Sequence, residues 1–324
     1  MKKIFLLSVL SFLVFAGSLV QAQTLTWTAG GVGGGWYAIA GGISNIINEK
    51  SGGITVKVIP GGGTVNPSLV NKGDCELGWG LPFMNAAAWN GEDPYANNKH
   101  SNLRAIAGGM SMNYFHFYVG AETPYKTTDD IFKQKKATRL AISPSGTSDE
   151  WVFRKVLAHY KTDYKDLEAV RFKFFRGSYA EQASQFKDRN VDGVFTFLAT
   201  PAAAVTEASI GRSLKIINFT PDLLESLAKY GIGTGKILPN TYPKAANANE
   251  EITTAIAGSV IIVNKNLPDE VAYRIAKVIH ENLDQFRKIH GSLSPYELKH
   301  AVTGTGIPLH PGAEKYYKEK GVLK

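Results

Sequence analysis

The stretch Gly30–Tyr37, GGVGGGWY, joins a short apolar run to a segment with helical periodicity. Two similar stretches follow, Pro60–Thr64 (PGGGT) and Ser143–Ser148 (SPSGTS), and each precedes a predicted helix. The first turn of a helix has N–H groups without intrahelical partners and carries a partial positive charge. Glycine lets a ligand approach such groups closely. The three loops therefore predict a shared site for a small anion, formed by several helix N-termini.

Short apolar runs alternate with helical patterns along the chain. In the first part, one helical face carries Trp36, Ala40, Ile43 and Ile47. The rhythm restarts after Pro124, with a further set of strands and helices. Strands are predicted at 25–27, 54–59, 76–79, 103–108, 113–119, 138–142, 170–175 and 191–197. This alternation indicates an α/β protein whose sheets are mostly parallel, with ligands bound beyond the carboxyl ends of the strands.

The length and the late return of a strand predict two lobes. A buried strand is expected at Ala257–Val263, and Pro268 begins a long amphipathic helix. We expect lobe 1 to comprise residues 23–120 and 240–324, and lobe 2 to comprise residues 121–239. Each lobe is predicted to be a sheet flanked by helices, with a cleft between the lobes.

The first 22 residues have the features of a secretory signal peptide. Lys2 and Lys3 precede an apolar run from Ile4 to about Ala16, and cleavage is expected after Ala22. The alternative is an uncleaved membrane anchor, but the run is shorter than the roughly 20 residues that a spanning helix needs. We therefore expect an exported protein that does not span the membrane after cleavage.

Charge and cysteine content exclude several classes of protein. The net charge is +8, and removal of Lys2 and Lys3 leaves 34 basic and 28 acidic residues, or +6. These charges are spread along the chain, whereas a nucleic-acid-binding protein concentrates them, so no nucleic-acid partner is expected. Cys75 is the single cysteine, which excludes an intramolecular disulfide and a cysteine-built metal site. A small buried residue is the favoured role for it.

Signals for catalysis are weak. The sequence lacks a Gly-x-Ser-x-Gly elbow, a His-Glu-x-x-His helix and the spacing of the dinucleotide fingerprint. His116 lies in an apolar strand, where a satisfied core histidine is favoured over a catalytic base. Thr127 and Thr128 before Asp129 and Asp130 are typical of a helix cap. No nucleophile, base and orienting group form a set, so we expect no enzyme activity, no cofactor and no metal.

Several side chains near the loops are candidate ligand contacts. Hydroxyl donors are available on Thr64, Ser145, Thr147 and Ser148, although turns and helix caps are the commoner use of such residues. Aromatic or apolar walls are offered by Trp36 and Tyr37, by Leu81, Pro82 and Phe83, and by Phe195 and Phe197, with core packing as the alternative. Arg104 and Arg176 are possible carboxylate partners, with an ion pair within the protein as the alternative.

An ordered set of motifs resembles one known family. Each motif is weak alone, but their order from Gly30 to the C-terminus resembles the TAXI-family solute receptors of TRAP transporters. The motifs are Gly33–Tyr37, Pro60–Pro67, Asn102–Ala107, Ser143–Thr147, Val191–Phe195, Thr241–Pro243 and Ile307–Ala313.

The resemblance implies a two-lobed periplasmic binding protein of the type II-like fold. It would bind a small organic acid such as glutamate or 2-oxoglutarate, and deliver it to TRAP membrane permease subunits driven by an ion gradient. We expect it to be a monomer. The positions that match the family's ligand-binding loops are Gly34, Gly35, Trp36, Tyr37, Gly62, Gly63, Thr64, Leu81, Pro82, Ser145, Gly146, Thr147, Tyr179 and Phe197.

Two departures from the family pattern affect the expected ligand. Many relatives have polar residues where this chain has Leu81 and Pro82, and threonine where it has Phe197. Both changes make the site more apolar, which favours a carboxylic acid with an apolar body at least as much as glutamate. Two other functions remain open. One is a binding protein that serves an ABC transporter or a sensor kinase, and the other is a secreted enzyme.

Overall fold

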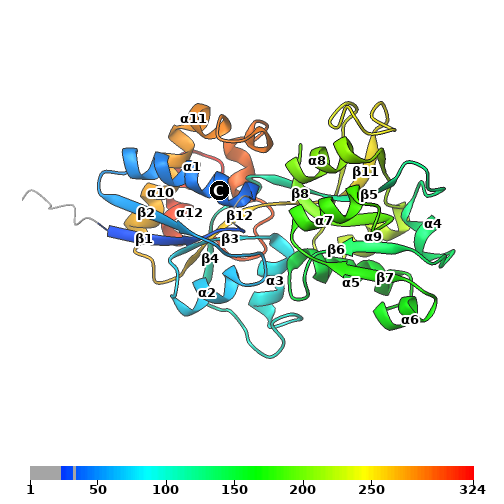
Figure 1. The fold of residues 1–324 in the computed structure, drawn as a ribbon. Coiled ribbons are helices and arrows are strands. Elements are labelled where there is room, and N and C mark those ends of the chain that lie inside the picture. The colour runs from blue at the N-terminus through cyan, green and yellow to red at the C-terminus, as the bar shows by residue number, and fades with distance from the viewer. Residues whose placement is uncertain (1–22, 32–33) are drawn as a thin grey trace, which may run out of the picture.

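The computed structural model describes residues 23–31 and 34–324. The predicted signal peptide and its cleavage site therefore lie outside the described residues, as do Val32 and Gly33 of the first glycine-rich loop. Figure 1 shows two lobes side by side, each a sheet with helices on its faces. The predicted two-lobed α/β architecture is confirmed. The expectation of mostly parallel sheets is wrong, because both sheets are mixed. No described helix is both long enough and apolar enough to cross a membrane.

The first lobe contains a five-stranded sheet in the order β2-β1-β3-β12-β4. Strand β12 is antiparallel to both of its neighbours, while β1 is parallel to β2 and β3. Leu25 and Trp27 of β1 are fully buried beneath the first helix, α1. The strands are β1 (Gln23–Thr28), β2 (Ile54–Ile59), β3 (Leu77–Gly80), β4 (Leu103–Ala107) and β12 (Val260–Asn264).

Helices from both ends of the chain cover this sheet (Figure 1). The C-terminal helix α12 packs against α10, and α10 packs against α1, so the two ends of the chain share one core. The helices are α1 (Gly35–Lys50), α2 (Asn66–Lys72), α3 (Pro82–Asn90), α10 (Asp269–Glu281), α11 (Leu283–Arg287), η1 (Gly291–Leu293), η2 (Leu298–Val302) and α12 (Pro311–Glu319).

The second lobe contains a mixed sheet in the order β10-β11-β5-β8-β6-β7, with β9 paired to β5. Strands β6, β7 and β8 are parallel, and β5 runs antiparallel to β8. The strands are β5 (Met112–Gly120), β6 (Arg139–Ile142), β7 (Lys173–Arg176), β8 (Gly193–Ala199), β9 (Leu214–Ile216), β10 (Gly233–Ile237) and β11 (Ile252–Gly258). The helices are α4 (Thr128–Phe132), α5 (Ser148–His159), α6 (Tyr164–Ala169), α7 (Tyr179–Lys187), α8 (Ala203–Gly211) and α9 (Pro221–Ala228).

The chain crosses between the lobes twice, at 108–111 and at Ser259. The single strand expected at 257–263 is therefore wrong, because β11 ends in the second sheet and β12 begins in the first. Strands β5 and β11 both belong to the second sheet. The chain therefore enters the second lobe before residue 120 and leaves it after residue 240, so neither crossing coincides with the boundary expected for it. The crossing segments touch: Ser259 N donates to Ser111 O at 2.9 Å, and Met110 N donates to Ser259 O at 3.0 Å.

His116 on β5 is a satisfied core histidine, as the sequence predicted. It is fully buried, its Nδ1 donates to Tyr114 O at 3.0 Å, and its Nε2 accepts from Tyr242 OH at 2.7 Å. Burial lowers the pKa of His116 to about 4, so the imidazole is neutral at pH 7. The helix cap predicted at Thr127 and Asp130 is also present, as a capping box that begins α4.

Candidate functional site

One buried side chain organises the strand-end loops of the first lobe. Asn66, in the first turn of α2, is fully buried. Its Nδ2 donates to Ala29 O at 2.7 Å and to Trp79 O at 2.8 Å, which join the ends of β1 and β3. Its Oδ1 accepts from Gly62 N and from Thr28 Oγ1, both at 2.8 Å. All four hydrogen-bonding positions of this side chain are used, so Asn66 fixes the three loops relative to one another.

Part of the Pro60–Thr64 loop is consequently structural. The N–H of Gly62, one of the predicted contacts, is bonded to Asn66, and the N–H of Gly61 donates to Gly30 O at 3.2 Å. Gly63 and Thr64 extend toward the second lobe, where Thr64 Oγ1 donates to Gly146 O. This contact brings two of the three glycine-rich loops together across the boundary between the lobes, as the sequence predicted.

The start of α1 is linked to the crossing segments. Trp36 Nε1 donates to Ser259 Oγ at 2.8 Å, and Trp36 O accepts from Trp79 Nε1 at 3.0 Å. Trp36 is half-buried, and so are Gly34, Gly35 and Tyr37. The N–H groups of Gly35 and Trp36 occupy the first turn of α1, where the helix offers no acceptor for them. These amides are candidate donors for an anion.

A second buried side chain organises the loops of the other lobe. Asp149, in the first turn of α5, is 4% exposed. Its Oδ2 accepts from Tyr179 OH at 2.9 Å, Ser143 Oγ at 3.1 Å and Phe197 N at 3.2 Å, and its Oδ1 accepts from Ser148 Oγ at 3.3 Å. Burial raises the pKa of Asp149, and these hydrogen bonds partly offset the effect. The Tyr179 hydroxyl therefore anchors Asp149 within the second lobe.

The Ser143–Ser148 loop begins α5 with a side-chain cap. Thr147 Oγ1 accepts from Glu150 N at 3.3 Å and donates to Pro144 O at 2.8 Å, so this hydroxyl is used within its own loop. Ser145 and Gly146 are exposed, and Gly146 has a φ of +84°, which glycine adopts without strain. Ser145 is thus the side chain of this loop that is free to meet a ligand.

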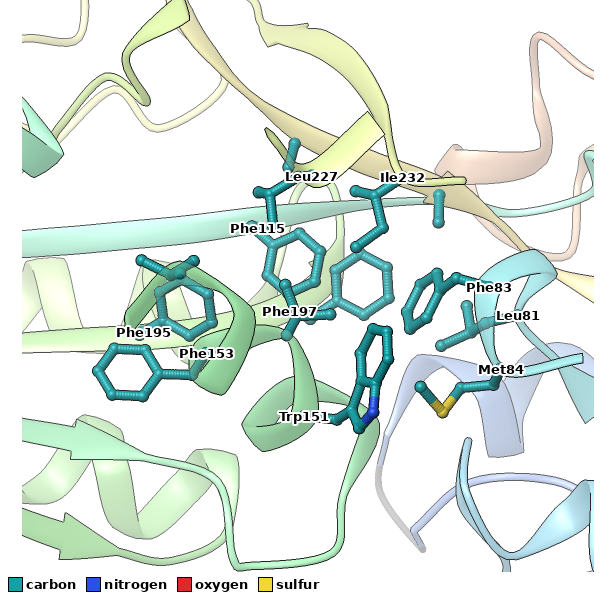
Figure 2. Close-up of a cluster of buried hydrophobic side chains, with 14 of the residues drawn as sticks. Leu81, Phe83, Met84, Phe115, Trp151, Phe153, Phe195, Phe197, Leu227 and Ile232 are labelled. Carbon is teal, nitrogen blue, oxygen red and sulfur yellow. The ribbon is translucent and has the colours of Figure 1, made fainter. Parts of the chain in front are cut away.

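The apolar wall predicted beside these loops is packed within the protein (Figure 2). The ring of Phe83 stacks on Trp151 at 5.6 Å between centroids and lies 6.4 Å from Phe197. Phe197 stacks on Phe115 at 4.1 Å and is 5% exposed, while Leu81 is fully buried. The side chains of Leu81 and Phe197 therefore belong to one apolar cluster that continues from the first lobe into the second. Pro82 next to Leu81 is half-buried at the start of α3.

The two arginines proposed as carboxylate partners bind within their own lobes. Arg104 lies near the start of β4, at the end of the sheet remote from the glycine-rich loops. It donates to Leu103 O at 2.7 Å, and its guanidinium lies 5.2 Å from the Trp89 ring. Arg176 lies 4.4 Å from the Tyr164 ring, with its Nη1 4.0 Å from a Glu150 oxygen. This geometry favours the alternative of local partners for both residues.

Two cavities lie away from the loops. One of about 250 Å³ is lined by Asn71, Cys75 and Asn264 among others, at the opposite end of the first sheet. The other, of about 580 Å³, lies between α9 and strands β10 and β11. Neither is lined by a predicted contact residue. At the glycine-rich loops the two lobes touch through Thr64 and Gly146.

Comparison with known proteins places the chain in a family. Residues 27–321, nearly all of the described chain, match the model of the NMT1-like family. The chain belongs to the NMT1-like family. Three solved structures share its fold at low sequence identity, and each is matched over almost its whole length.

MatC from Rhodopseudomonas palustris, solved with bound malate, is 12% identical, with a TM-score of 0.55 over 94% of this chain and 100% of MatC. A Streptococcus mutans structure, described for glutathione import via GshT and the cystine ABC importer TcyBC, is 12% identical, with a TM-score of 0.51 over 86% of this chain and 100% of that chain. A putative L-cystine ABC transporter from Listeria monocytogenes is 10% identical, with a TM-score of 0.50 over 84% of this chain and 95% of that chain.

Sequence reasoning about this NMT1-like chain missed the residues that hold the site together. Asn66 falls within a quoted motif and Asp149 within a helix start, but both residue types are common at such positions. Trp151 and Asp93, which join the two lobes, were not identified either. The available signal was a polar residue within two positions of the second and third glycine-rich loops, and only its hydrogen bonds distinguish such a residue from an ordinary helix cap.

Proposed function

We propose that this chain is an exported solute receptor of a membrane transporter, and that it binds a small organic anion between its lobes. One observation carries the proposal: loops at strand ends of both lobes meet at a single boundary, where Thr64 contacts Gly146. Such loops at the carboxyl ends of strands are where α/β sheets bind ligands. The fold shared with solved transporter proteins supports the same conclusion.

The chemistry at this boundary suits binding better than catalysis. The amides of Gly35 and Trp36 and the hydroxyl of Ser145 are donors, and helix N-termini favour negative charge. Asp149 is a buried titratable group behind these loops, and its carboxylate oxygens are occupied by four hydrogen bonds. A residue so engaged positions loops and is not placed to transfer a proton to a ligand. We therefore propose no enzyme activity.

The expected ligand is a mono- or dicarboxylic acid with an apolar body. The carboxylate would bind to the amides at the start of α1. The apolar part would contact the half-buried Pro82 at the start of α3, with Leu81 and Phe197 packed in the core behind it. Leu81 and Phe197 offer no side-chain donor, so extra polar groups on a ligand would lose hydrogen bonds there. Malate is bound in the MatC structure, and a related small acid is compatible with the donors present here.

The partner is proposed to be a TRAP permease in the cytoplasmic membrane, with the receptor in the periplasm as a monomer. The ordered motifs that resemble TAXI receptors support this choice. An ABC importer is the second candidate, because two structural neighbours are described with ABC transporters. Transport assays in vesicles that contain one permease type or the other would decide between them, since only the true partner would accept ligand from this receptor.

A thermal-shift screen tests the proposal. The panel would pair each acid with its neutral primary amide: 2-oxoglutarate, glutamate, malate and hexanoate are suitable. We expect one or more acids to raise the melting temperature saturably while the matching amide does not, because ligand at about 100 times its Kd stabilises by about 2.7 kcal/mol. Ser145→Ala should weaken the effect, and Ser294→Ala, a surface control far along the chain, should not. Equal responses to acids and amides, or no response at millimolar acid, would refute anion binding.

A further inference from the structure

Asp93 connects the two lobes at one carboxylate. It lies in the loop after α3 of the first lobe, and its Oδ2 accepts from Trp151 Nε1 at 2.8 Å. The same oxygen lies 3.2 Å from Arg154 Nη1 and 3.2 Å from Lys155 Nζ. All three donors belong to α5 of the second lobe. Trp151 Nε1 also approaches Asp93 O at 3.0 Å, so the main chain of this loop takes part.

The three donors occupy one face of α5. Their spacing along the sequence, i, i+3 and i+4, places Trp151, Arg154 and Lys155 on the same side of the helix. The face is directed at the first lobe, because Phe83 of α3 stacks on the Trp151 ring at 5.6 Å. Figure 2 shows Phe83 and Trp151 side by side between the lobes. Separation of the lobes would therefore break the ion pairs of Asp93 and expose the Trp151 ring at the same time.

Trp151 is buried by groups from both lobes. It is 4% exposed, with Phe83 on the first-lobe side. On the second-lobe side, the ring of Tyr230 meets it edge-on at 5.5 Å and Lys155 Nζ lies 4.5 Å from its centroid. Exposed ion pairs contribute little alone, and Asp93 is half-exposed. The buried indole N–H is different, because its loss of a partner carries a desolvation cost.

We propose that Asp93 and the Trp151–Lys155 face of α5 form a latch that holds the two lobes together. The latch sets how often the boundary opens, so weakening it would speed both entry and exit of a bound molecule. That consequence for ligand exchange rests on the proposed function, whereas the latch itself does not. The latch can be tested on protein to which no ligand has been added.

The experiment uses ligand-free protein labelled with 5-fluorotryptophan, together with small-angle X-ray scattering. The chain has five tryptophans, and Trp151→Phe identifies the Trp151 resonance. Asp93→Asn keeps a side-chain acceptor for the indole and removes the ion pairs. Asp93→Ala removes the ion pairs and the side-chain acceptor, and leaves the indole only the main-chain oxygen at position 93. We expect the open fraction to rise in that order, by about tenfold for Asp93→Ala, the effect of one lost hydrogen bond to a charged group. The radius of gyration should increase in parallel.

Asp222→Asn is the matched control, since Asp222 is similarly exposed and faces Lys133 and His159 within the second lobe. It should leave the Trp151 resonance and the radius of gyration unchanged. The resonances of Trp27 and Trp79 in the core of the first lobe report whether each variant is folded. Asp93→Ala protein that is folded and as closed as the parent would overturn the latch. Equal opening in Asp222→Asn would overturn it too, because the effect would then be one of general charge.

Discussion

Asn66 and Asp149 have the same role in opposite lobes: each is buried in the first turn of a helix and makes four hydrogen bonds to strand-end loops. Asn66 both donates and accepts, and therefore joins carbonyl and N–H groups of three loops. Asp149 only accepts, and gathers hydroxyl groups and one N–H. The geometry of the boundary between the lobes depends on both.

Asn66→Ala should destabilise the first lobe strongly. The substitution leaves the carbonyls of Ala29 and Trp79 and the N–H of Gly62 without partners, at a cost of about 3 kcal/mol or more. Urea unfolding measures the change. Asn48→Ala is the control, because Asn48 also bonds to main chain, at Val56, but is exposed on α1. If Asn66→Ala lowers the free energy of unfolding no more than Asn48→Ala does, Asn66 does not hold the loops.

Asp149→Asn should change the pH dependence of stability in a defined direction. Because the folded pKa of Asp149 is raised, the folded state binds more protons than the unfolded state between the unfolded and folded pKa values. The charged carboxylate is thus unfavourable at pH 7, and the penalty is relieved as pH falls. We expect the free energy of unfolding of Asp149→Asn, relative to that of the parent, to decrease as the pH is lowered from 7 to 4. Urea unfolding at each pH measures this difference. An unchanged or opposite difference would contradict the raised pKa.

Two buried histidines should destabilise the protein in acid. Burial lowers the pKa of His116 and of His280 to about 4. The unfolded state, with a histidine pKa of about 6.5, binds more protons than the folded state in this window, so stability falls as pH falls from about 6.5 to 4. Each histidine lowers the free energy of unfolding by up to about 1.4 kcal/mol for each pH unit in this window.

His116→Phe tests the assignment, because it removes one of these groups while keeping a ring in the core. The slope of unfolding free energy against pH between 6.5 and 4 should decrease by the contribution of one histidine, whatever the effect on stability at pH 7. The substitution also leaves the Tyr242 hydroxyl without its partner, which lowers stability. That loss is similar at each pH, so it does not change the slope. The same slope in parent and variant would mean that folding does not lower the pKa of His116.

Gly63→Ala should force the lobes apart, whereas Gly62→Ala should not. A Cβ at Gly63 would lie 2.7 Å from Ser148 Oγ and 3.3 Å from Leu81 Cδ1, but a Cβ at Gly62 meets nothing within 4 Å. Because Ser148 begins α5 of the second lobe, the clash falls on the interlobe boundary. We expect a larger radius of gyration and at least about tenfold weaker ligand binding for Gly63→Ala. Equal behaviour of the two alanine variants would argue that the loops do not meet in solution.

The sequence alone determined the α/β class, the strand-end position of the glycine-rich loops and the core role of His116. These features depend on local periodicity, on turn residues and on apolar neighbours, all of which can be recognised within a few residues. The cap at Thr127 belongs to the same group, since the residues that satisfy its N–H groups lie within one turn.

Only the tertiary structure decided where the chain changes lobes and what the loops contact. Apart from Ser259, the 257–263 segment contains only glycine and apolar residues, which suit either sheet. Its division at Ser259 therefore depends on the strands with which each half pairs. Likewise, Asn66, Asp149 and Asp93 have partners up to 62 residues away in the sequence. A side chain that fixes distant loops has no local pattern, because its neighbours exist only after folding.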